Sequence, residues 1–416
     1  MTDPAEPSPA QRYGLSATVF ALGAVSLLTD VAADMVTPYL GVFLTRHLGA
    51  PAAALGLLEG AADSLSALTK YLAGRASDRG GRRTPWIVAG YALANAARPL
   101  LSLATAPWHV FAVRLTDRVG KGLRTAPRDA LLAASVHPSR RATAFGIHRG
   151  MDNLGAVFGP LCAIAVLQHT HGDLRAVFAA AAIPGALAVL TLRLAVREGP
   201  ARAPARAAAA TEPDATSGPL PGPLRAYLGW VALLAAATAS DTFLLLRAAD
   251  LGVATRHLPL LWGGLSLLRA LTAAPGGRLA DRIGPARAVN LGWALRALAW
   301  MGFGLAQTPT QLLLALVLYG SFYGLTEGTE RALVASLCPP SRLGRAFGAF
   351  NLVTGALALP ASLLFGALYP HDHGRTAFVL YGAVTLVAAW GLRRWRHQRA
   401  DTEEGPTPPR AQSPSQ

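Results

Sequence analysis

Apolar stretches long enough to cross a bilayer recur along the whole of this 416-residue chain. A membrane-spanning helix needs about 20 predominantly apolar residues. Most of the stretches meet this length, and mostly short polar connections separate them. The pattern therefore predicts an all-α integral membrane protein with twelve transmembrane helices, at residues 15–45, 51–73, 85–106, 108–135, 141–168, 174–195, 224–249, 258–277, 286–306, 310–336, 343–368 and 375–394.

One connection is far longer than the others. Residues 197–223 are rich in Pro, Ala and Arg and lack the apolar side chains of a core, which predicts a cytoplasmic linker. The linker divides the spans six and six, so we expect an N-terminal six-helix bundle at 15–196 and a C-terminal one at 224–395. Residues 1–14 and 396–416 are predicted to be cytoplasmic tails, the second disordered by composition.

Two segments of the first half recur in the second half in the same order. GRASDRGGR at 74–82 returns as GRLADRIGP at 277–285, and HPSRRATAFG at 137–146 returns as PPSRLGRAFG at 339–348. The offsets, 203 and 202 residues, are nearly equal. Because internal repeats indicate duplicated structural units, we expect two pseudo-symmetric bundles in parallel orientation.

The position of the basic residues explains the net charge of the chain. Charged residues make up 15% of it, against about 25% in a soluble protein, yet the net charge is +15. Arg is concentrated in the connections of one side, as the positive-inside rule describes for cytoplasmic loops. This predicts that both termini are cytoplasmic and explains the charge without a nucleic-acid partner. The preference for Arg over Lys, with abundant Ala, Gly and Pro, is typical of a GC-rich bacterial sequence, so we expect the bacterial inner membrane.

Short motifs occupy particular connections and spans. The loop after the second span follows G-x-x-x-D-R-x-G-R-R, and a fainter copy lies in the second half. The fourth span carries R-x-x-x-G at Arg118 and Gly122, and the fifth carries G-x-x-x-G-P. The motif residues are Gly74, Asp78, Arg79, Gly81, Arg82 and Arg83 in the loop, Gly277, Asp281, Arg282 and Gly284 in its copy, and Gly155, Gly159 and Pro160 in the fifth span.

These motifs together resemble the major facilitator superfamily, and the fifth-span motif resembles its antiporter branch. The segment DRVGKGLRTAPRDAL at 117–131 is similar to a bacterial subgroup. The resemblance implies two halves related by an axis along the membrane normal. It also implies that spans one, four, seven and ten line a central path, along which a small solute moves by alternating access.

Physical chemistry suggests roles for the motif residues. Gly74 permits close approach of helices, and Asp78 with Arg79 could latch the cytoplasmic side by facing a helix N-terminus or an opposite charge. Gly155 and Gly159 leave one helix face without side chains, and Pro160 is expected to bend that helix. The alternatives are topology anchoring for Arg82 and Arg83, and simple tight packing for the glycines.

Charges at membrane depth are costly and are candidates for function. The fourth span carries a stripe of them along one face, and the other candidates lie on the first, second, fifth, seventh and tenth spans. The candidate pathway residues are Asp30, Asp34, Glu59, Asp63, Arg114, Asp117, Arg118, Lys121, Arg124, Arg128, Asp129, His148, Asp152, Asp241, Glu327, Glu330 and Arg331. By the repeat offset, the pair Arg128–Asp129 corresponds to Glu330–Arg331, with the charges reversed.

Their roles stay open between two interpretations each. Asp30 and Asp34 are the leading candidates for reversible protonation, or they form permanent ion pairs with fourth-span arginines. Arg118, Lys121 and Arg124 could bind an anionic group of the substrate, or they neutralise nearby carboxylates. His148 could relay protons or simply pack. Asp117, one turn before Lys121, is expected to neutralise it.

Several chemistries are excluded. No Walker-type phosphate loop, catalytic motif or Cys/His cluster occurs, so we expect no enzyme, no cofactor and no metal site. Close His pairs at 169/171 and 371/373 are interpreted as exposed loop residues. The function that remains is a secondary transporter, expected to act as a monomer in proton-coupled efflux of a drug or metabolite. The alternatives are an importer or exchanger of an organic or inorganic anion and, less favoured, a non-transporting membrane sensor.

Overall fold

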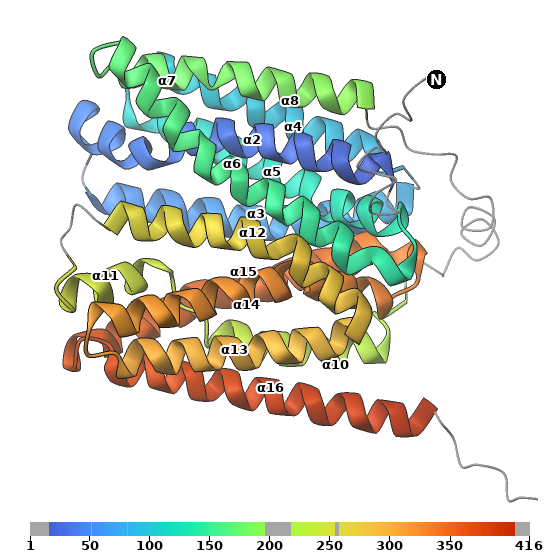
Figure 1. Cartoon of the computed structure of the whole chain (residues 1–416). Helices are drawn as coiled ribbons and strands as arrows, with labels where there is room; N and C mark the ends of the chain where they lie inside the picture. The colour runs from blue at the N-terminus through green and yellow to red at the C-terminus, as the bar shows by residue number, and fades with distance from the viewer. Residues whose placement is uncertain (1–15, 51, 81, 196–217, 254–257, 404–416) are drawn as a thin grey trace, which may run out of the picture.

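Two bundles of helices lie side by side in the computed structural model, which describes residues 16–50, 52–80, 82–195, 218–253 and 258–403 (Figure 1). The first half consists of α2 (Ala17–Val42), α3 (Ala52–Gly80), α4 (Thr84–Ala97), α5 (Pro107–Ala134), α6 (Arg141–His169), α7 (Leu174–Ala180) and α8 (Ala182–Ala195). The second half consists of α10 (Gly222–Ala236), α11 (Thr242–Asp250), α12 (Leu258–Ile283), α13 (Pro285–Leu305), α14 (Pro309–Ser336), α15 (Leu343–Leu368) and α16 (Arg375–Glu403). This is the predicted all-α architecture.

Some predicted spans are interrupted or extended. The first ends in a π-helical turn, η1 (Phe43–His47), and the third ends in a 3-10 segment, η2 (Arg98–Leu103). The sixth is divided between α7 and α8, and the seventh between α10 and α11. Helix α16 continues to Glu403, so the predicted disordered tail from 396 begins too early. The reason is that the run after Arg393 is rich in Arg, Gln and Ala, which favour a helix.

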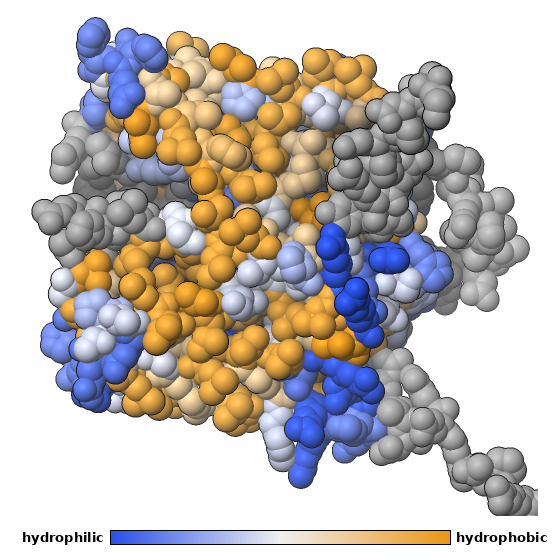
Figure 2. Space-filling model, in the orientation of Figure 1, coloured by the Kyte–Doolittle hydropathy of each residue, from blue (hydrophilic) through white to orange (hydrophobic). Residues whose placement is uncertain are grey.

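The surface has the polarity of a membrane protein. Hydrophobic residues cover the middle of the molecule and hydrophilic residues gather toward its two ends (Figure 2). Within the described residues, six segments are long and apolar enough to cross a membrane by length and composition alone, namely Ala17–Gly41, Pro138–His169, Leu174–Ala195, Pro309–Ser336, Pro340–Leu368 and Arg375–Gln398. Helix α5 carries more charge, and most of its charged side chains are buried against neighbouring helices.

One backbone turn is repeated in the two halves outside the repeated sequence motifs. His171 and His373, one from each close His pair, both adopt positive φ, 53° and 55°, and each precedes a glycine with positive φ. The glycines donate equivalent bonds, Gly172 N to Leu167 O and Gly374 N to Tyr369 O, at 2.9 and 2.8 Å. These histidines therefore form the same turn in both halves. No group of three or more His, Cys, Asp or Glu side chains in the described chain could hold a metal ion.

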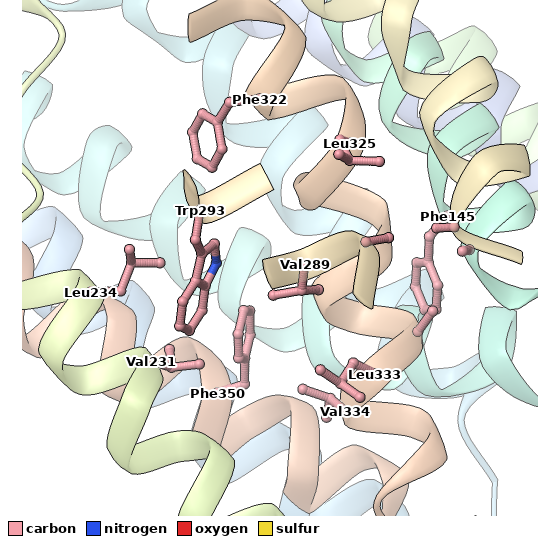
Figure 3. Close-up of a cluster of buried hydrophobic side chains, with 14 of the residues drawn as sticks. Phe145, Val231, Leu234, Val289, Trp293, Phe322, Leu325, Leu333, Val334 and Phe350 are labelled. Atoms are coloured by element: carbon pink, nitrogen blue, oxygen red, sulfur yellow. The ribbon is translucent and has the colours of Figure 1, made fainter. Parts of the chain in front are cut away.

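One buried hydrophobic cluster extends through both halves, and a second cluster lies within the first half. In the second half Trp293 of α13 is fully buried and lies among Val231 and Leu234 of α10 and Phe322 of α14 (Figure 3). Its indole Nε1 donates a 2.7 Å hydrogen bond to Glu330 Oε1. The bond satisfies a polar group that burial would otherwise leave unpaired.

Glycines bring the two halves into backbone contact. A Cβ atom on Gly74 of α3 would overlap the carbonyl oxygen of Gly344 on α15, and one on Gly277 of α12 would overlap that of Ala142 on α6. These two contacts are equivalent under the sequence repeat. Both lie at what we call the linker end, formed by residues 78–80, 82–84, 135–141, 218–222, 281–285 and 336–343 (right side of Figure 1).

Candidate functional site

Two aspartates at the linker end each cap a helix of the opposite half. Asp78, at the end of α3, accepts hydrogen bonds from the backbone N–H groups of Gly344 (3.0 Å) and Arg345 (2.7 Å) at the start of α15. Asp281, near the end of α12, accepts from those of Ala142 (3.0 Å) and Thr143 (2.9 Å) at the start of α6. Because a helix N-terminus has unpaired N–H groups and positive potential, both contacts hold the halves together.

Burial raises the pKa of Asp78 and of Asp281 above the ordinary value of a carboxyl group. The backbone N–H donors oppose this increase, because they favour the charged form. Arg83 adds a cation to the first cap, with Nη2 3.5 Å from Asp78 Oδ1, and also donates to Pro340 O across the interface at 3.0 Å.

The remaining motif residues differ in position. Arg79, Arg82 and Arg282 are exposed at the linker end, where they fit the topology interpretation. Gly284 adopts φ 93° before α13, a conformation that favours glycine. Gly81 lies outside the described residues. Helix α6 continues through Pro160.

An ion cluster joins the halves deeper in the bundle. Asp129 of α5 is fully buried, and its Oδ2 lies 3.2 Å from Arg331 Nε of α14 and 3.9 Å from Arg149 Nη2 of α6. Arg149 Nε in turn lies 3.7 Å from Glu327 Oε1. Arg128 completes the cluster, with Nη2 2.9 Å from Asp129 Oδ1. Carboxylates and guanidinium groups of both halves thus share one buried network.

The reversed charge order of the repeat has a geometric reason. Asp129 and Arg331 are equivalent positions, 202 residues apart, and they contact each other. Equivalent residues meet only where they lie close to the pseudo-symmetry axis, and identical charges there would repel. The other member of the second-half pair, Glu330, accepts a hydrogen bond from Trp293.

Asp30 and Asp34 lie against the face of α6 that is formed by glycines. A Cβ on Gly155 would contact the Cβ of Asp30 at 2.8 Å, and a Cβ on Gly159 would contact that of Asp34 at 2.8 Å. Both aspartates are half-buried. Gly155 and Gly159 follow Arg149 by six and ten residues. At a rise of 1.5 Å per residue, the contacts with Asp30 and Asp34 therefore lie about 9 and about 15 Å further from the linker end than Arg149 does.

Replacing Gly155 or Gly159 by Ala is expected to lower the free energy of unfolding by about 1–3 kcal/mol, the cost of overpacking a close contact. The added methyl group must displace α2 at Asp30 or Asp34. Chemical denaturation of the purified protein measures the loss. Gly229→Ala, where a Cβ meets nothing within 4 Å, is the control, and an equal loss there would contradict the packing role.

Asp117 has a partner that the sequence does not indicate, in addition to the predicted one. Its Oδ1 lies 2.8 Å from Arg98 Nη2, and its Oδ2 lies 3.9 Å from Arg114 Nη1. Asp117 therefore interacts electrostatically with Lys121 and forms a buried ion pair with Arg98. Arg98 also donates to Thr29 O of α2 at 2.9 Å and to Asn95 Oδ1 at 3.0 Å.

Sequence reasoning missed Arg98 and its counterpart Arg296, because they stand in spans with few other charges. Arg296 of α13 donates to Ala237 O (3.0 Å) and Thr238 Oγ1 (2.7 Å), where α10 ends. In each half, therefore, an arginine of the third span donates a hydrogen bond to a backbone carbonyl oxygen of the first span. A lone arginine inside an apolar span is the signal that could have found them.

The cationic stripe of α5 divides into different environments. Arg114, Arg124 and Arg128 are buried, whereas Arg118 and Lys121 are half-buried. The guanidinium of Arg124 lies 4.1 Å from the ring centroid of Tyr91 on α4. Lys121 interacts electrostatically with Asp30. The predicted stripe therefore exists, and part of it lies between helices rather than along a path.

His148 and Asp152 lie beside the ion cluster. His148 is fully buried, and its Nδ1 lies 3.6 Å from Asp152 Oδ2. Asp152 Oδ2 also pairs with Arg149 Nη1 at 2.9 Å. His148 thus lies beside the network without a hydrogen bond to it in the described chain.

In the second half, the candidate Asp241 is bonded to side chains of two other helices. Asp241, in the break between α10 and α11, accepts from Arg269 Nη2 at 2.6 Å and from the Tyr319 hydroxyl at 2.7 Å. The Arg269 guanidinium lies 3.8 Å from the Tyr323 ring centroid. Of the second-span candidates, Asp63 is exposed, and the side chain of Glu59 lies outside the described residues.

Comparison with known proteins gives one consistent result. The Major Facilitator Superfamily profile matches residues 22–249 and 229–415. An uncharacterised MFS-type transporter of Methanocaldococcus jannaschii is 28% identical over 90% of this chain and 93% of its own length. The multidrug resistance protein MdtH of Cronobacter sakazakii is 31% identical over 29% of each chain. The human organic anion transporter MFSD10 has a similar structure, with TM-score 0.69 and 18% identity, over 90% of this chain and 99% of its own.

Proposed function

Because the chain belongs to the Major Facilitator Superfamily, a family of secondary transporters, we propose that it exports a small drug or metabolite across the bacterial inner membrane in exchange for protons. The partial likeness to a multidrug resistance protein supports efflux. The cytoplasmic position of both termini, the monomeric state and the boundaries of the two bundles remain part of this proposal.

One observation carries the coupling to protons. Asp30 and Asp34 are half-buried carboxylates pressed against a helix that has no side chains at the contact. Asp30 interacts with the carboxylate of Asp152 and with the cations Arg124 and Lys121. Asp34 interacts with Lys121 and Arg98. A carboxylate that exchanges a cationic neighbour for a proton as helices move can couple the two fluxes.

The contacts between the halves at the linker end support transport by alternating access. The aspartate caps lie between the halves there, and the Asp129–Arg331 pair joins the halves deeper in the bundle, so this conformer supports a closed linker end. Opening requires each cap to be released and the ion cluster to separate. Protonation or substrate binding further along the path must therefore favour one arrangement of the halves over the other.

Asp30→Asn and Asp34→Asn are expected to abolish transport driven by a pH gradient while leaving substrate exchange intact, because Asn mimics a permanently protonated carboxyl group. Purified protein is first screened for thermal stabilisation by cationic, neutral and anionic compounds. The compound that stabilises it is then followed in proteoliposomes with an imposed pH gradient.

Asp173→Asn is the matched control, since it removes an exposed carboxylate that caps α7 and Asn also caps. Gradient-driven transport that survives both pathway substitutions would overturn proton coupling through these residues. A loss in the control as well would overturn their specificity.

Import or exchange of an anion is the second candidate. In the described first half the cations at membrane depth outnumber the buried or half-buried carboxylates: Lys70, Arg98, Arg114, Arg118, Lys121, Arg124, Arg128 and Arg149 against Asp30, Asp34, Asp117, Asp129 and Asp152. An anionic compound that enters together with protons in the same assay would favour this function. A sensor would transport no compound.

A further inference from the structure

An aromatic groove lies on the outer surface of the second half, away from the proposed path. It has a volume of about 550 Å³ and lies between α10 and α16. Its lining residues include Ala226, Gly229, Trp230, Leu233 and Trp390. Gly229 is exposed and leaves the groove open, because a Cβ there would meet nothing within 4 Å.

The groove runs from the linker end toward the membrane interior. Trp230 packs directly on Gly391, so its indole forms a rigid floor. Leu233 and Trp390 lie deeper, whereas Arg394 and Gln398 lie nearer the end of α16. Tryptophan and arginine together are typical of the interface between hydrocarbon and headgroups.

Positive charge surrounds the mouth of the groove. The exposed Arg394 guanidinium lies 4.0 Å from the Trp390 ring centroid, which holds it in place. The charges of Arg287 and Arg393 act on the neighbouring Arg396. No carboxylate pairs with Arg394 in the part of the chain that the structure describes, so this cation is available to an anion.

We propose that this groove binds an anionic phospholipid, with the phosphate at Arg394 and an acyl chain along Trp230 and Leu233. A basic mouth and an apolar interior match the two parts of such a lipid. The equivalent helix of the first half, α8, ends with Arg193 but has no tryptophan. The proposed site is therefore restricted to the second half.

Native mass spectrometry of the full chain in detergent tests the proposal, with palmitoyl-oleoyl-phosphatidylglycerol and the matching phosphatidylcholine titrated separately. We expect phosphatidylglycerol to bind more tightly. Arg394→Gln is expected to weaken its binding about fivefold, the effect of one basic residue near a lipid surface, and to leave phosphatidylcholine unchanged. Arg193→Gln is the matched control and is expected to change neither.

Gly229→Leu gives a second test without a change of charge. Leu favours a helix, and its Cβ would meet no atom within 4 Å. Because residue 229 lines the groove, the rest of the side chain occupies groove volume. We expect it to weaken binding of both lipids. Equal effects of Arg394→Gln and Arg193→Gln, unchanged binding in Gly229→Leu, or displacement of phosphatidylglycerol by glycerol 3-phosphate at the same concentration would each overturn the proposal.

Discussion

Replacing Asp129 by Asn is expected to lower the free energy of unfolding by about 3–5 kcal/mol, the cost of removing one partner from a buried ion pair. Asp129 is the carboxylate that faces Arg128, Arg149 and Arg331 together. Without its charge, three guanidinium groups remain close to one another in a poorly solvated site. The midpoint of chemical denaturation in detergent measures the loss.

Glu327→Gln is the matched control for this prediction. Glu327 belongs to the same network, but its carboxylate is partly exposed and lies 3.7 Å from a single guanidinium nitrogen. Partly exposed pairs contribute about 1 kcal/mol or less, so we expect a small change. If the two variants are equally destabilised, Asp129 does not have the central position that its contacts indicate.

A double-mutant cycle measures how much the ion pair across the interface contributes to stability. Arg128 and Arg149 pair with Asp129 within one half, whereas Arg331 reaches it from the other. We expect Asp129→Asn and Arg331→Gln to be non-additive by about 0.5–3 kcal/mol, the range for groups in one network. Additive effects would mean that the pair across the interface contributes nothing.

The sequence predicted the features that depend on local pattern. The twelve spans follow from apolar runs, and the homologous halves follow from the repeated loops. A carboxylate at the end of a helix suits either a neighbouring helix N-terminus or a basic residue, and Asp78 contacts both, at the start of α15 and at Arg83. Its counterpart at Asp281 follows from the repeat.

Partners across helices could not be read from the chain. Arg98 and Asp117 are 19 residues apart on different helices, so no helical spacing relates them. Asp117 and Lys121, one turn apart, interact as their spacing suggests, but the direct ion pair is with Arg98. The break between α10 and α11 was also not predicted, because the apolar runs on its two sides together have the length of one span. Arg296 binds the freed carbonyl of Ala237 there.

The double variant Asp78→Ala/Asp281→Ala is expected to open the linker end. Each carboxylate satisfies two backbone N–H groups at the start of a helix in the other half. Loss of a cap costs about 0.5–2 kcal/mol. Two caps together therefore shift the equilibrium between closed and open arrangements by about 1–4 kcal/mol, from about fivefold to several hundredfold.

Spin labels report this shift directly. Ser139→Cys and Ser336→Cys place one label on each half at exposed linker-end positions, after Cys162 and Cys338 are replaced by Ala. We expect pulsed electron paramagnetic resonance to reveal a longer distance in the double Ala variant. Asp78→Asn/Asp281→Asn is the control, because Asn caps a helix nearly as well as Asp. A small shift with Asn and a large one with Ala would assign closure to the hydrogen bonds. Equal large shifts would assign it to the interaction of the charges with the helix dipoles, and an unchanged distance in both would mean that glycine packing and the ion cluster keep the end closed without the caps.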